Sequence, residues 1–102
     1  MSDKPATAAF EALAVPPPAL EKGGYEVIRA VIAEGELHVS LRRAFDEPET
    51  WGVLLADVAR HIARIYALEA SMREEQVVEK VWAMFEAEME RPTDIGKTNA
   101  IS

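Results

Sequence analysis

Histidine and arginine side chains are the candidate reactive and ligand-binding groups of this chain. His61 follows Asp57 by four residues in the segment DVARHIARIY, which places both side chains on one face of a helix. A carboxylate beside an imidazole can orient a general base or complete a metal shell. A metal site needs about three or four ligands, and the sequence has one other histidine, His38. We therefore expect no metal and no cofactor, and interpret the pair as part of a solvated helix face.

A second group of polar side chains belongs to residues 25–42, YEVIRAVIAEGELHVSLR. Donors that gather on one face of a sheet could hold a carboxylate or a phosphate. Clustered donors of this kind can equally be rim residues of a protein interface. The candidate ligand-binding residues are Arg29, His38, Ser40 and Arg42.

The abundance of Val and Ile in this segment predicts a β-hairpin with a two-residue turn at Glu34-Gly35. If Ala33 pairs with Glu36, six apolar residues share one face and the candidate donors share the other. The six are Ile28, Ala30, Ile32, Leu37, Val39 and Leu41.

Two helices are predicted after the hairpin. Residues 45–70 carry one stripe of large apolar residues and, beside it, a stripe of small residues that permits close backbone approach. Asp46 could cap this helix. Ser71, with Glu74 three residues later, indicates the start of a second helix, and Pro92 ends it.

The two ends of the chain are expected to lie outside the domain. Residues 1–24 are a Pro/Ala-rich leader that we expect to be partly disordered, because Pro16, Pro17 and Pro18 disfavour a helix and favour polyproline II. Alternatively, residues 6–15 could add a third strand. Residues 25–91 form a single domain and residues 92–102 a flexible tail. The predicted fold class is α+β: an antiparallel hairpin followed by two helices that pack on one face of the sheet (ββαα).

A two-stranded hairpin is marginal by itself and leaves both strand edges open. A homodimer could complete this structure, either by extending the sheet across a strand edge or by packing helices through the small-residue stripe. The candidate interface residues are Tyr25, Val27, Val31, Ala59 and Ala63.

The charge and composition of the chain argue against several classes of protein. The chain of 102 residues has a net charge of -7 and no basic segment, which argues against binding to nucleic acid or to an anionic membrane surface. It contains no cysteine, so disulfides and thiolate chemistry are excluded. Asp3 and Glu11 interrupt what could be mistaken for a signal peptide, and no apolar run reaches the ~20 residues of a membrane helix. We expect a cytoplasmic location.

Three motifs carry a family resemblance: LAVPPPAL, GELHVSLRRAF and WGVLLADVARHIARIYA, which together cover most of residues 13–67. They resemble short alphaproteobacterial proteins that are grouped as a domain of unknown function. The resemblance implies a small bacterial, cytosolic α+β protein and carries over no catalytic role.

These observations favour a non-catalytic module that forms a homodimer and binds an unidentified protein partner. The alternative is a small anionic-ligand-binding or enzymatic domain that uses the outer sheet face, with His38, Arg29 and Arg42.

Overall fold

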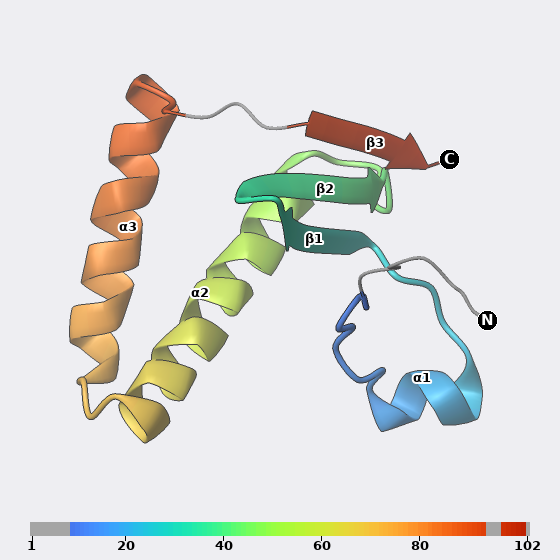
Figure 1. Ribbon diagram of the computed structural model, residues 1–102, viewed down its shortest axis with the longest axis horizontal. Coiled ribbons are helices and arrows are strands. Elements are labelled where there is room, and N and C mark those ends of the chain that lie inside the picture. Colours follow the sequence, from blue (N-terminus) through green and yellow to red (C-terminus); the bar gives the residue numbers. More distant parts are fainter. Residues whose placement is uncertain (1–8, 94–96, 102) are drawn as a thin grey trace.

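The computed structural model describes residues 9–93 and 97–101. Figure 1 shows a small sheet beside an antiparallel pair of long helices, with a short helix near the N-terminus. The α+β class and the order of hairpin followed by two helices are as predicted. The elements are α1 (Pro17–Lys22), β1 (Ile28–Ala33), β2 (Glu36–Arg42), α2 (Glu49–Glu69), α3 (Glu74–Glu90) and β3 (Lys97–Ile101).

The hairpin forms in the predicted register. Ala33 pairs with Glu36 at the turn and Ile28 pairs with Leu41 at the open end. Both turn residues have positive φ, 55° at Glu34 and 76° at Gly35, as a type I′ turn requires. Gly35 adopts this conformation without steric cost, whereas the side chain of Glu34 is disfavoured there.

Replacing Glu34 with Asn should therefore stabilise the protein. Asn tolerates positive φ better than Glu, and Asn-Gly is the preferred type I′ pair. We expect a gain of about 0.5–1 kcal/mol, since strain at a non-glycine residue of this kind costs on the order of 1–3 kcal/mol. Urea denaturation measures the change, and a lower midpoint for the variant would contradict the assigned turn.

A third strand departs from the sequence prediction. β3 pairs parallel with β2, and the strand order is β1-β2-β3. The expectation of a loose tail is therefore wrong for residues 97–101. A parallel neighbour needs a long crossover connection, and α2 and α3 together supply it. The short, largely polar segment KTNAI gives little strand signal by itself, so its pairing depends on the open edge of β2.

The proline-rich leader contains a helix, which corrects the expectation of polyproline II. Pro17 and Pro18 occupy the first turn of α1, where the missing backbone N–H groups would have no partner within the helix. The backbone N–H of Ala19 donates to the carbonyl of Pro16 at 3.0 Å, and that of Gly23 donates to Ala19 at 3.0 Å. Residues 9–15 form no strand, and the remaining residues of the leader, 1–8, lie outside the described part.

The break between the two long helices falls where it was predicted. Ser71 has a φ of 57° and cannot act as an N-cap, which requires an extended backbone. Arg73 takes the N-cap position of α3, and Pro48 takes that of α2. Neither helix start has a side-chain cap, so the predicted capping roles of Asp46 and Ser71 are wrong.

Ala63, which belongs to the small-residue stripe of α2, packs against α3 within the same chain. Among residues 9–93, the buried apolar side chains are Ala63, with 1% of its surface exposed, and Val77, with 4%. The alanine permits close approach of the two helix backbones at this point. Within the described residues, the helix pair therefore holds the buried side chains.

Replacing Ala63 with Leu should overpack this contact and destabilise the protein by about 2 kcal/mol, because a well-packed contact resists added methylenes. Ala56 lies on the same helix and is exposed, so Ala56→Leu serves as the control and should change stability by less than ~0.5 kcal/mol. Equal unfolding free energies for the two variants in denaturant titrations would contradict this packing.

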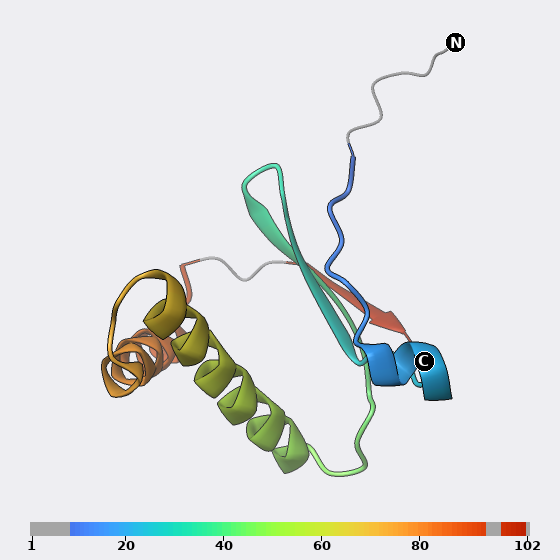
Figure 2. The same cartoon turned by 90° about the horizontal axis from the view of Figure 1, so that it is seen from below.

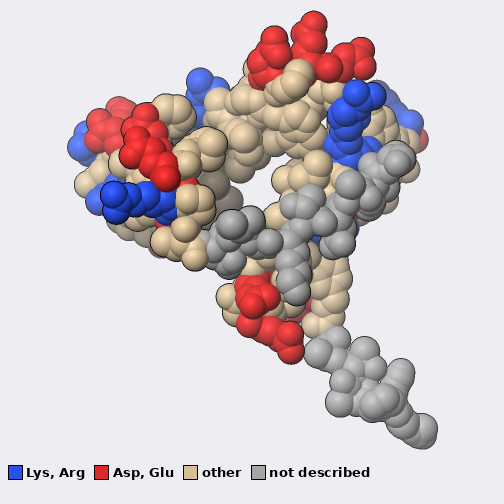
Figure 3. Space-filling view, turned by 90° about the horizontal axis from the view of Figure 1, so that it is seen from above, with Lys and Arg blue, Asp and Glu red and all other residues tan. Residues whose placement is uncertain are grey.

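The two helices do not cover the sheet, and this corrects the predicted packing. No Cα atom of α2 or α3 lies within 8 Å of a Cα atom in any strand. Figure 2 shows the sheet standing apart from the helix pair, and Figure 3 shows an opening through the molecule between them. At the start of α2, Phe45 of the linker stacks edge-on against Trp51, with ring centroids 5.1 Å apart. This contact joins the linker to α2 and not to the sheet.

Candidate functional site

Three of the four predicted ligand-binding residues lie together. Arg29, Ser40 and Arg42 line a shallow pocket of about 170 Å³ on the hairpin, which they share with Glu26. His38 is on the same face but does not line the pocket. Its Nε2 atom lies 3.9 Å from a carboxylate oxygen of Glu36.

The arginine donors in this pocket already have partners. The guanidinium of Arg29 lies 3.0 Å from the carboxylate of Glu26. The Nε atom of Arg42 donates to the backbone carbonyl of Glu26 at 2.9 Å, and its guanidinium lies over the ring of Tyr25, 5.2 Å from the centroid. Arg29 lies in the same way over the ring of Phe10, at 5.5 Å. Glu26 lies just before β1, so its contacts with Arg29 and Arg42 hold the segment that enters β1 against the hairpin.

The Asp57–His61 pair does not form the arrangement that general-base chemistry needs. Asp57 pairs with Arg60 at 3.2 Å, and Nδ1 of His61 lies 3.2 Å from the guanidinium of Arg64. All of these hydrogen bonds are exposed to solvent. Within the described residues, no group of three or more His, Asp or Glu side chains is arranged to hold a metal ion.

The predicted interface residues fall into two groups. Tyr25 is 66% exposed, while Val27 and Val31 on the hairpin are half-buried. Ala59 is half-buried and Ala63 is buried against α3. Ala63 is therefore not open to a partner in this conformation, because α3 of the same chain covers it.

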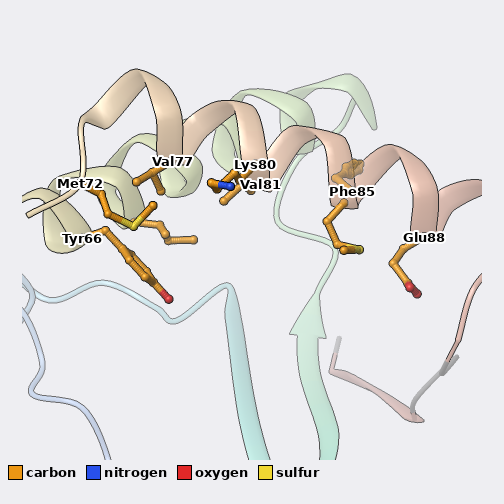
Figure 4. Close-up of a pocket in the computed structure, with 9 residues that line it drawn as sticks. Tyr66, Met72, Val77, Lys80, Val81, Phe85 and Glu88 are labelled. Atoms are coloured by element: carbon orange, nitrogen blue, oxygen red, sulfur yellow. The ribbon is translucent and has the colours of Figure 1, made fainter. Parts of the chain in front are cut away.

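An apolar groove of about 540 Å³ runs between α2 and α3. Ile62 and Tyr66 contribute to it from α2, and Val81, Met84 and Phe85 from α3. Figure 4 shows Tyr66 at one end of the groove and Glu88 at the other, with the labelled α3 side chains between them. The periodicity of residues 45–70 predicted an apolar stripe, and both helices were expected to pack on the chain's own sheet. An open groove between the helices was therefore not predicted.

Further apolar surface lies outside the groove, on α2 and on the sheet. Leu55 and Val58, on the stripe of α2 beside the groove, are 51% and 43% exposed. On the sheet, the directly opposed pair Ile32 and Leu37 are 72% and 44% exposed. Figure 3 shows that much of the surface around the opening carries no charge. Adjacent apolar patches of this kind mark interaction surfaces.

The fold and these surfaces define a small α+β domain that presents uncovered apolar faces on both of its layers. The chain belongs to the family described as Domain of unknown function (DUF5076), which matches residues 12–93. This confirms the resemblance to a domain of unknown function.

A solved structure is similar in fold over most of the chain. It comes from the photosynthetic bacterium Rhodopseudomonas palustrus CGA009 and is described as a "putative pyruvate dehydrogenase". The two sequences are 39% identical, the TM-score is 0.73, and the match covers 94% of this chain and 100% of that one. A comparison of the chain with curated proteins found no match. Within the described residues, no helix has both the length and the apolar character needed to cross a bilayer.

Proposed function

We propose that this chain is a non-catalytic interaction module that self-associates as a homodimer and presents the assembled surface to another protein. The observation that carries the proposal is the exposure of large apolar side chains on the sheet and on the helix pair together. Among residues 9–93, the buried apolar side chains are Ala63 and Val77. Two buried side chains contribute little against the conformational entropy that folding removes, about 1–2 kcal/mol for each residue.

The exposed fractions of individual side chains support the same conclusion. Within the described residues, Ile32 on the sheet is 72% exposed, and Trp82 and Met84 on α3 are 59% and 63% exposed. Each partner buries about 800 Å² in a standard interface. A second copy could cover these apolar side chains in an interface of that kind.

The midpoint of thermal unfolding tests this proposal. If folding and association are coupled, the midpoint rises with protein concentration. For two chains of this length we expect a rise of about 3 °C for each tenfold increase, because unfolding entropy scales with the number of residues. Circular dichroism between micromolar and hundred-micromolar protein measures it. A midpoint independent of concentration would contradict the proposal.

A small-anion site on the hairpin is the second candidate function. Two observations favour it: Arg29, Ser40 and Arg42 line one pocket, and the description of the solved neighbour names an enzyme of pyruvate, a small carboxylate. Against it, Glu26 already pairs with Arg29, and its negative charge opposes the entry of an anion.

Thermal-shift measurements with pyruvate and with phosphate separate the two candidates. The interaction module predicts no shift with either anion. A shift that Arg29→Ala abolishes in a folded variant would support the anion site. Glu36→Gln serves as the matched control, because it changes a charge on the hairpin outside the pocket.

A further inference from the structure

We propose that the helix pair of one copy packs on the apolar sheet face of a second copy, and that the second copy does the same in return. Each contact between a helix layer and a sheet layer would then be formed by two chains. This inference rests on the proposed self-association and specifies which surfaces meet.

The first support is the separation of the two layers within one chain. The helices and the sheet each have an apolar face, yet they make no close contact with each other. Domains of this class are stable when a helix layer covers a sheet layer. Since the protomer supplies both layers but leaves them apart (Figures 2 and 3), a second copy can provide the missing layer for each.

The second support is the match between the exposed faces. The sheet offers β-branched and leucine side chains, including Ile32 and Leu37. The helix pair offers Val58 from α2, and Met84 and Phe85 from the groove. The methionine is unbranched and can fill gaps against a twisted sheet.

The charge distribution favours packing of the helix pair on the sheet of a second copy over packing on its helix pair. α3 carries six Glu and one Lys, a net charge of -5. Residues 25–43 of the hairpin region carry three Glu and three Arg, with no net charge. Packing the helix pair of one copy against that of another would bring two acidic helices together, whereas packing it against the hairpin does not.

Edge-to-edge pairing does not remove the exposed apolar surface. β1 is an outer strand of the sheet, and its backbone could pair with β1 of a second copy. Such pairing would leave the face that carries Ile32 and the groove that carries Met84 uncovered. Reciprocal exchange covers both, and its two-fold symmetry closes the assembly at two copies.

Cross-linking between introduced cysteines tests this arrangement, because the natural sequence has no cysteine. One variant carries Ile32→Cys on the sheet and another carries Met84→Cys in the groove. The two are mixed, unfolded, refolded together and treated with a flexible bis-maleimide that spans on the order of 10 Å, the scale of a layer contact. We expect the mixed adduct, with one chain of each kind, to be the main product.

Arg60→Cys on the charged face of α2 replaces Met84→Cys in the control mixture, where we expect several times less mixed adduct. Leu37→Cys substitutes for Ile32→Cys if that variant does not refold, as judged by circular dichroism. Adducts of two Ile32→Cys chains alone would overturn the inference in favour of sheet contacts. Adducts of two Met84→Cys chains alone would overturn it in favour of helix contacts. A monomeric mass of the mixture before cross-linking would contradict self-association itself, so the two failures are distinguishable.

Discussion

Replacing Val58 with Glu should dissociate the assembly and lower the free energy of unfolding by about 3 kcal/mol per chain, because it would bury an unpaired carboxylate in a covered apolar face. In an isolated protomer the same change would cost little, since Val58 is 43% exposed and the new carboxylate could reach water. Urea denaturation and the mass of the native species measure the two effects.

Val53 provides the matched control for this variant. It is also a valine of α2 and is 62% exposed, but its helical spacing places it with Asp57 and Arg60 on the charged face. Val53→Glu should change stability by less than ~0.5 kcal/mol and leave the mass unchanged. If the two variants behave alike, the stripe that contains Val58 is not covered.

The second large effect is expected on the sheet. Ile32→Lys should lower the free energy of unfolding by about 2 kcal/mol or more, because the partner's helices would cover this position and desolvate the ammonium group. The side chain is 72% exposed in the protomer, so a monomeric protein would tolerate the change. Guanidinium denaturation with light scattering checks both stability and mass.

Ala33→Lys is the control, because it introduces the same side chain at the next residue of β1, on the opposite face and directly across from Glu36. A cross-strand pair of opposite charges is neutral or slightly stabilising, so this variant should keep wild-type stability. Loss of association in Ala33→Lys but not in Ile32→Lys would show that the other sheet face is the covered one.

The hairpin and the break between the long helices follow from the sequence because neighbouring residues determine them. Glu34-Gly35 and the alternation of apolar residues specify one hairpin register, since a shift by one residue would oppose apolar to polar side chains. The helix break near Ser71 follows in the same way from the change in the apolar stripe. Both predictions are confirmed.

Non-local packing was predicted less well than local structure. Periodicity led to the prediction that the apolar stripe of α2 packs on the chain's own sheet and that Ala63 contacts a partner. In the structure Ala63 is buried by α3, and the stripe beside it remains exposed. Periodicity identifies an apolar face, but it does not say whether the covering surface comes from the same chain or from another.

The candidate anion site was predicted only in part. The register placed Arg29, Ser40 and Arg42 on one face correctly. No pattern in the sequence indicated that Glu26 would pair with Arg29 through its carboxylate and accept a hydrogen bond from Arg42 at its backbone carbonyl. Residues at the entry of a strand lie outside the alternating pattern, so their contacts depend on the path of the leader.

The mass of the native protein decides whether the chain self-associates. Light scattering on size-exclusion peaks, over a dilution series down to low micromolar protein, should give twice the chain mass of 11.3 kDa. A mass of 11.3 kDa for a species that still unfolds cooperatively would contradict self-association, because the exposed apolar faces would then need no second copy.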